Sequence, residues 1–149
     1  MSRPIKQGLD YFPMDVDTDE KIELIEAMHG VRGFAIIVKL WQKIYKDNGY
    51  FVRWNPETAS LFSKQINVNI NELTAVMDDC FRYQIFNKRI YARYKVLTSV
   101  QVQSEFVSAI QRRKEVNLCK NLILIDINSI INVHINWVNV DNSTQSRVK

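Results

Sequence analysis

The sequence predicts a mainly helical domain with a small β-sheet. Apolar residues recur every three or four positions over much of the first 117 residues, which is the period of an amphipathic helix. Short apolar runs interrupt this period. In the run at 50–54, Tyr50, Val52 and Trp54 alternate with Phe51 and Arg53, so they would face opposite sides of a strand. Gly, Asn and Pro bound this run, as is typical of a strand. With 149 residues, 46% hydrophobic and 24% charged, the chain is long enough to bury one core.

The N-terminal third is expected to be an arm followed by two helices. Residues 1–14 hold two of the three prolines and one glycine, so they are expected to be extended. A helix follows over about 20–30, and a stronger one over 31–47, each with an apolar face at helical spacing. Gly30 is placed to end the first helix, and the Asp-Asn-Gly run at 47–49 ends the second.

The middle of the chain is expected to be one strand and two helices. The strand at 50–54 is followed by Asn-Pro, which suits the cap and first position of a helix reaching about residue 65. Asn69 with Glu72 three residues later resembles a capping box. It opens a helix over 70–83 with a continuous apolar face that includes Cys80, which is expected to be buried.

The remaining elements are two strands, a hairpin tip and a helix. Strands are expected at 84–86 and 95–99, and the basic, aromatic segment between them is expected to form a hairpin tip, or wing. A last helix spans about 99–117. Residues 121–149, rich in Asn, Ile and Val, are expected to be a linker or a loosely attached tail.

This order of helix, strand, two helices, strand, wing and strand is that of a winged helix-turn-helix domain. An extra helix precedes it and another helix follows it, and the whole domain, with its N-terminal arm, is expected to cover residues 1–120.

Several stretches resemble the N-terminal domain of DnaD-like phage and prophage replication-initiation proteins, the replisome organisers. They are "RPIKQGLDYFPMDVD", "KIELIEAMHGVRGFAIIVKLWQKIY", "LTSVQVQSEFVSAIQRRKE" and the Asn/Val-rich tail, and the similarity covers about residues 3–120. The resemblance implies an oligomerising winged-helix domain that helps to load a helicase at an origin. Its implied partners are another copy of the chain, DNA, and a replicative helicase or its loader. Longer members carry much of their DNA binding in a separate C-terminal domain that these 149 residues do not show, so the chain either lacks that function or is a fragment.

An acidic run near the N-terminus raises the question of a metal site. Residues 10–30 carry seven acids against Lys21. The alternating Asp residues at 15, 17 and 19 echo a calcium loop, but Glu20 stands where that loop requires glycine. Asp17 and Glu20 instead match a helix-capping pair, and acids in a first turn favour the positive end of the helix dipole. An acidic surface that docks a basic region of another copy stays open.

Nothing in the sequence predicts an enzyme. His29 and His134 have no sequence-level partner, Cys80 and Cys119 lie outside any CxxC pattern, and the four glycines are scattered. We therefore expect no catalytic residues, no metal and no cofactor. The N-terminus lacks the apolar core of a signal peptide, and no run approaches the ~20 apolar residues of a membrane span. A cytoplasmic protein without a membrane partner is expected.

DNA is the partner that the charge distribution favours. Residues 84–120 carry eight bases against two acids, whereas the helix at 70–83 carries outward acids that would repel phosphates in the major groove. Sequence-tolerant contact is therefore expected from the wing and the last helix, with tyrosines stacking on bases of single strands. The alternatives are a solvated surface, or a sequence-specific winged-helix transcriptional regulator. The expected DNA-binding residues are Lys88, Arg89, Tyr91, Arg93, Tyr94, Lys95, Arg112, Arg113 and Lys114.

The arm is the candidate for self-association. It holds four apolar side chains ahead of the core, which pack either on their own domain or on a neighbouring copy. These residues are Leu9, Tyr11, Phe12 and Met14.

Overall fold

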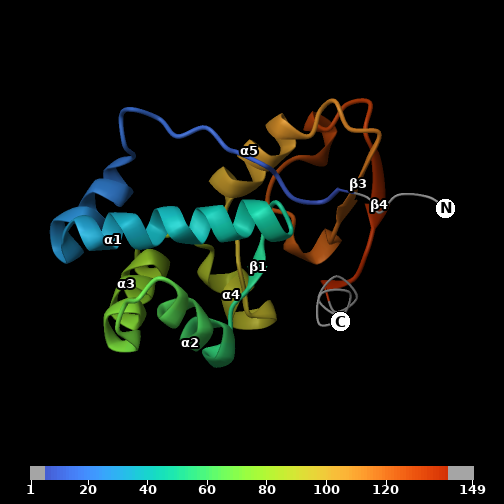
Figure 1. Ribbon diagram of the computed structural model, residues 1–149. Coiled ribbons are helices and arrows are strands. Elements are labelled where there is room, and N and C mark those ends of the chain that lie inside the picture. The colour runs from blue at the N-terminus through green and yellow to red at the C-terminus, as the bar shows by residue number, and fades with distance from the viewer. Residues whose placement is uncertain (1–5, 141–149) are drawn as a thin grey trace.

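The computed structural model describes residues 6–140 as a mainly helical fold with two small two-stranded sheets (Figure 1). The mainly helical class with little sheet is thus confirmed. Among the described residues, none of the helices is long and apolar enough to cross a membrane. In chain order the elements are α1 (Glu20–Asp47), β1 (Val52–Arg53), α2 (Pro56–Gln65), α3 (Ile70–Arg82), α4 (Lys88–Tyr94), β2 (Val96–Leu97), α5 (Val100–Ala109), β3 (Glu115–Leu118), the 3-10 turns Lys120–Leu122 and Ile127–Ser129, and β4 (His134–Trp137).

Helix α1 is the axis of the fold. In Figure 1 it crosses the molecule, with α2, α3 and α4 below it and α5 above it. The two helices expected here are joined through a kink at Gly30, whose φ of 75° is readily available only to glycine. The N-terminal cap is Asp19, whose side chain accepts a hydrogen bond from the Lys21 N–H at 2.7 Å, so the cap lies two residues after the expected Asp17.

The helices α2 and α3 start where the sequence predicts. Asn55 and Thr58 exchange side-chain and backbone hydrogen bonds of 2.9 and 2.7 Å, a capping box that begins α2. Asn69 caps α3 by accepting from the Asn71 N–H at 2.7 Å. Strand β1 pairs antiparallel with β2, with Val52 opposite Leu97, which joins the segment before α2 to the segment after α4.

Two expected elements are wrong. Residues 84–86 form no strand, because Gln84 adopts a left-handed φ of 62° and the chain turns to bury Ile85 and Phe86. The segment 87–94 forms α4 and not a hairpin, so the wing of a winged helix-turn-helix is not found here. A tight hairpin tip needs Gly, Asn or Asp at its centre, and "KRIYARY" offers Lys, Arg and Ala, which favour helix.

The C-terminal part also differs from expectation. Helix α5 ends at Ala109, and residues 115–118 form β3, parallel to β4. The segment expected to be a loose tail is bound to the core where it is described: the Leu122 carbonyl accepts from the buried Gln103 side chain at 2.7 Å, and the Leu124 N–H donates to the same side chain at 2.7 Å. The rest of that expected tail, 141–149, lies outside the described residues.

One hydrophobic core joins these elements. Ile37, Leu40 and Ile44 of α1 are completely buried in it. Tyr50 ties the core to the C-terminal part, since its hydroxyl accepts a hydrogen bond from the Cys119 N–H at 2.7 Å. Cys80 is buried as expected, and burial raises the pKa of its thiol to about 12, which leaves it protonated.

Candidate nucleic-acid interface

Six of the nine residues expected to contact DNA lie on α4 or at its C-terminal cap. The helix begins because the Asn87 side chain accepts from the Ile90 N–H at 2.8 Å. It ends where Lys95 takes a left-handed φ of 56° and donates its N–H to the Tyr91 carbonyl at 2.8 Å. The buried Ile90 anchors the helix to the core. The basic segment is thus a short, firmly capped helix.

The cations of α4 have no acidic partner within residues 6–140. Two of them lie over aromatic rings: the Lys95 Nζ is 4.8 Å from the Tyr91 ring centroid, and the Arg93 guanidinium is 5.5 Å from that of Tyr94. Such contacts at exposed sites contribute only about 0.5–1 kcal/mol, so they leave the charges available to phosphate. All four basic residues are exposed: Lys88, Arg89, Arg93 and Lys95.

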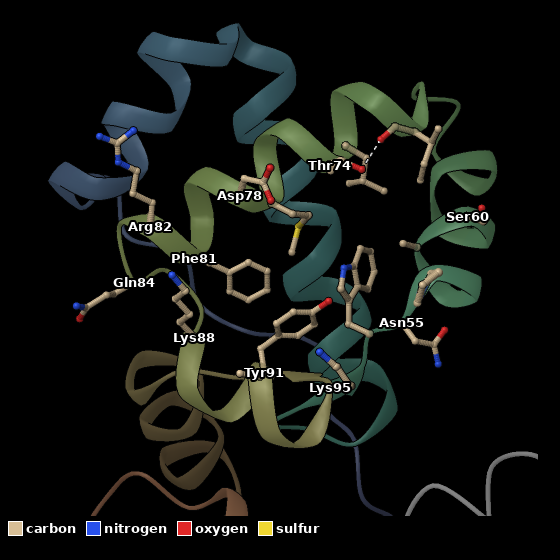
Figure 2. A pocket seen from close by; sticks show the side chains of 17 residues that line it. Asn55, Ser60, Thr74, Asp78, Phe81, Arg82, Gln84, Lys88, Tyr91 and Lys95 are labelled. Carbon is tan, nitrogen blue, oxygen red and sulfur yellow. Dashed lines mark hydrogen bonds between the residues drawn. The ribbon is translucent and has the colours of Figure 1, made fainter.

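Helix α4 also forms one wall of an open groove of about 1050 Å³, here called the α4 groove (Figure 2). The other wall comes from α2 and α3. The Phe81 ring of α3 stacks on the Tyr91 ring of α4, with centroids 4.5 Å apart and ring planes at 28°. The buried side chains of Trp54 and Met77 complete an apolar floor.

The rim of the α4 groove is basic. Three cations and one carboxylate border it, which suits a polyanion lying along an apolar floor. In Figure 2 Lys88 and Lys95 lie toward the bottom of the groove, at its left and right, and Asp78 and Arg82 of α3 lie above them. The charged rim residues are Asp78, Arg82, Lys88 and Lys95.

Two acidic side chains of α3 contact side chains of α1. The Glu72 carboxylate accepts two hydrogen bonds from the Arg32 guanidinium, at 2.8 and 3.0 Å. These bonds lower the pKa of Glu72 from its ordinary value of 4.5 and raise the pKa of Arg32. Asp79 lies 2.6 Å from the His29 ring nitrogen. The capping box expected from Asn69 and Glu72 is therefore replaced by a contact between helices, and the expected repulsion of phosphate by α3 is weaker.

The three basic residues after α5 are not part of the α4 groove. In Figure 1 α5 lies on the opposite side of α1 from α4. The Arg113 guanidinium donates to the carbonyls of Lys6, Gln7 and Gly8 at 2.7, 3.1 and 2.6 Å, so it holds the N-terminal arm. Burial lowers the pKa of Arg113, against the opposing effect of Asp10. Arg112 and Lys114 are exposed.

The residues expected to drive self-association divide into two pairs. Leu9 and Phe12 pack on their own domain: the Leu9 N–H donates to the Tyr45 carbonyl at 2.7 Å, and the Phe12 ring lies 4.6 Å from the Tyr45 ring. Tyr11 and Met14 are exposed, at 85% and 46%. The arm thus lies on its own domain and presents a second apolar edge to solvent.

The acidic run lies on the arm and the start of α1. Asp15 and Asp17 are exposed, and Asp19 caps α1. Within residues 6–140, no three His, Cys, Asp or Glu side chains are grouped closely enough to hold a metal ion.

Sequence reasoning missed several residues of the α4 groove. Trp54 and Phe81 have the spacing of core residues, and only the folded chain places them at the groove floor. Arg82 had a usable signal, because it is the one cation on the outward face of an otherwise acidic helix.

Comparisons with known proteins point to a phage-related group. The model of the Lin1244/Lin1753-like, N-terminal family matches residues 11–102, which include all of α4. Over 150 residues the chain is 43% identical to a Listeria innocua protein named "Uncharacterized phage-related protein Lin1244/Lin1753", and the match covers 95% of the chain. The chain spans about half, 49%, of the length of that relative. No solved structure matches the chain.

Proposed function

The chain belongs to the Lin1244/Lin1753-like N-terminal family, and from the basic α4 groove we propose that it is a DNA-binding, non-enzymatic domain of a phage-type replication-initiation protein. Its role is that of an oligomerising scaffold that makes auxiliary, sequence-tolerant contact with DNA. The phage-related name of the Listeria innocua relative is in keeping with this proposal. The replication role rests on the resemblance of residues 3–120 to DnaD-like replisome organisers.

The observation that carries the DNA contact is the set of exposed cations on α4 without acidic partners in residues 6–140. Phosphate contacts release condensed counterions, so such Lys and Arg side chains add affinity directly. These contacts carry little sequence information, because the phosphate backbone is the same at every base pair. The aromatic floor formed by Phe81 and Tyr91 supports the same assignment, since bases of a single strand stack on aromatic side chains with little sequence preference.

We also propose that the fold is a modified winged helix-turn-helix in which α4 takes the place of the wing. Two features support this relation. The order α1, β1, α2, α3, β2 follows that of the winged helix, and β1 pairs antiparallel with β2. A helix at the wing position would still present basic residues beside the helix-turn-helix pair α2 and α3.

The scaffold role is proposed to use the exposed edge of the arm. Tyr11 and Met14 are large apolar side chains open to solvent, and such residues mark contact sites when they gather on one segment. The partners in this proposal are another copy of the chain, DNA of low sequence specificity, and a replicative helicase or its loader.

The test is DNA affinity measured by fluorescence anisotropy on the full 149-residue chain. Labelled random-sequence DNA, single-stranded and duplex, is titrated at about 50 mM and about 200 mM salt. The test variant replaces the four α4 cations with Ala. The matched control removes the same charge from exposed lysines elsewhere. The test positions are Lys88, Arg89, Arg93 and Lys95, and the control positions are Lys39, Lys46, Lys64 and Lys120.

The test variant is expected to bind at least about tenfold more weakly at low salt. Its salt slope is expected to become shallower by roughly 0.7–0.9 for each phosphate that the protein no longer neutralises. The control should retain most of the wild-type affinity. Equal affinities for wild type and test variant, or equal losses in test and control, would contradict the proposal.

The same assay separates the rival function. A sequence-specific transcriptional regulator of this fold would prefer its site over random duplex by about 10³-fold or more. Asp78 stands on the outward face of α3, and the Thr74 hydroxyl is bonded to the Ile70 carbonyl at 2.8 Å, so α3 offers few groups for reading bases. Selection of one sequence from a random duplex pool would replace our proposal with the regulator.

A further inference from the structure

The arm covers a second pocket, of about 220 Å³, which we call the arm pocket. It lies between residues 12–19, α1 and α5. The Phe12 ring is tilted over the Tyr45 ring at 4.6 Å and meets the Trp41 ring edge-on at 6.4 Å. Phe34 also lines it. The inner wall of the arm pocket is therefore aromatic.

The rim of the arm pocket is acidic. Its carboxylates come from two parts of the chain that are far apart in sequence, and none of them forms an ion pair with a residue in 6–140. They are too dispersed to share one metal ion. A longer organic cation, which places its charge at one point and its alkyl part along the rings, suits this spacing better. The four rim carboxylates are Asp15, Asp17, Asp19 and Glu105.

A hydroxyl without a protein partner among the described residues lines the arm pocket. Tyr45 lines the arm pocket and is only 4% exposed, yet its hydroxyl forms no hydrogen bond with any described residue. Burial, and then the nearby Glu105 carboxylate, raise the pKa of Tyr45, so the hydroxyl is neutral. The hydroxyl oxygen is not fully enclosed by protein, so a bound N–H donor can reach it and donate a hydrogen bond to it.

We propose that the arm pocket binds an organic cation, namely a primary ammonium or guanidinium group at the end of a slim alkyl chain. The rim carboxylates neutralise its charge, the Tyr45 oxygen accepts one of its hydrogen bonds, and the faces of Phe12 and Trp41 attract it. The volume of about 220 Å³ is below the roughly 300–1,000 Å³ of ordinary small-molecule sites, so one head group fits and a nucleotide does not.

Two sources carry this chemistry. One is a lysine or arginine side chain of a partner polypeptide, and the other is a free amine such as agmatine. This site goes beyond the proposed DNA contact, because its charge is opposite to that of the α4 groove and DNA would be repelled from it.

The experiment is an NMR titration of the full 149-residue chain, read at the indole N–H of Trp41. The signal is assigned with the Trp41→Phe variant. The probes are the blocked tripeptide Gly-Arg-Gly, free agmatine, and the neutral blocked tripeptide Gly-Gln-Gly. We expect saturable shifts with the two cations and none with the neutral peptide.

Three variants test the pocket chemistry. Asp17→Asn combined with Glu105→Gln should weaken binding of the cations about tenfold, as removal of charge-assisted hydrogen bonds predicts. Tyr45→Phe should weaken it roughly threefold, because the ring stays and one acceptor is removed. Glu23→Gln removes an acid that does not line the arm pocket, and it should leave binding unchanged.

The outcomes decide both the site and its source. Tighter binding of the arginine peptide than of agmatine assigns a polypeptide partner, and the reverse assigns a free amine; both results support the site. The absence of a saturable shift with either cation, an equal shift with Gly-Gln-Gly, or wild-type affinity in the Asp17→Asn, Glu105→Gln variant would overturn it. These results do not depend on DNA binding.

Discussion

The α4 groove and the arm pocket have the same kind of inner wall and opposite rims. Both are lined by aromatic rings, but the α4 groove is bordered mainly by cations and the arm pocket by carboxylates. They also differ in how the chain builds them. The α4 cations come from residues 88–95, a single short segment, whereas the arm pocket gathers residues from 12–19, α1 and Glu105. The α4 cations thus depend on one short segment, whereas the rim carboxylates of the arm pocket are brought together only by the tertiary structure.

Polar contacts hold the start of the arm, residues 6–8, ahead of the segment that lines the arm pocket. The Arg113 guanidinium donates hydrogen bonds to three backbone carbonyls of the arm. The Gln7 side chain donates to the carbonyls of Asn48 and Asn117, at 2.9 Å each. The α4 cations form no ion pair with another residue in 6–140. Substitutions of the α4 cations should therefore change binding without changing stability, whereas substitutions around the arm pocket should often change both.

The largest effect is expected from two tyrosines of the core, of which only Tyr45 lines the arm pocket. Tyr50→Phe removes the acceptor for the buried Cys119 N–H and should lower the free energy of unfolding by about 1–3 kcal/mol. Tyr45→Phe removes a hydroxyl that has no partner among the described residues, so its stability should be close to that of wild type. Urea unfolding of both variants measures the difference.

The same two variants can also contradict the assignment of the Tyr45 hydroxyl to a binding site. If Tyr45→Phe were as destabilising as Tyr50→Phe, the Tyr45 hydroxyl would belong to the fold and not to a binding site. Similar m-values in the two variants are the control that both unfold by the same transition.

The exposed edge of the arm should control self-association. Tyr11→Ser with Met14→Ser keeps the inward contacts of Leu9 and Phe12 and removes the outward apolar surface. We expect the dissociation constant of the oligomer to rise about tenfold or more, as a smaller buried apolar area predicts. Light scattering over a concentration series measures it, with Leu61→Ser, an exposed apolar residue on α2, as the control. An unchanged oligomer would remove the arm from the scaffold proposal.

Substitution of Arg113 tests whether the arm and the DNA-binding surface on α4 are independent of each other. If Arg113 is an arm clamp, Arg113→Met should free the arm, speed its proteolysis by roughly tenfold, and leave DNA affinity within about twofold of wild type. Arg112→Met, at the exposed neighbour, should do neither. Weaker DNA binding in both variants would instead restore the prediction that residues 112–114 contact DNA.

Local signals predicted the parts of the fold that depend on local chemistry. The Asn55 cap of α2, the start of α3 and the apolar face that buries Cys80 follow from neighbouring residues, and all are confirmed. Strand β3 was missed because its alternation covers only four residues and its partner, β4, lies 16 residues further on. The hairpin expected at 87–94 was wrong because flanking strands were assumed where Gln84 turns the chain.

The candidate sites show the same division. The α4 cations and tyrosines could be found from sequence because they are adjacent, although their element was misassigned. The pairing of Arg32 with Glu72 and the approach of Glu105 to Tyr45 join residues separated by 40 and 60 positions, and no local pattern marks them. The acidic run was read as a helix cap, which Asp19 provides, but its position over aromatic rings required the tertiary structure.

The smallest effect is expected from Glu72, an acid of α3 that contacts α1 and does not line the α4 groove. Hydrogen bonds from Arg32 hold the pKa of Glu72 below its ordinary value of 4.5, so this pair stabilises the fold above that pH and loses its effect as the pH falls through the lowered pKa. Between about pH 5 and about pH 3, wild type should therefore lose slightly more stability than Glu72→Gln. The difference should be small and should shrink in high salt, because the pair is exposed to solvent. Thermal unfolding across this range measures it, with Asp78→Asn as the control, since Asp78 is an acid on the same helix that forms no ion pair within residues 6–140. Parallel pH profiles for wild type and Glu72→Gln would mean that Glu72 is free in solution, and its charge would then count against phosphate at the neighbouring α4 groove.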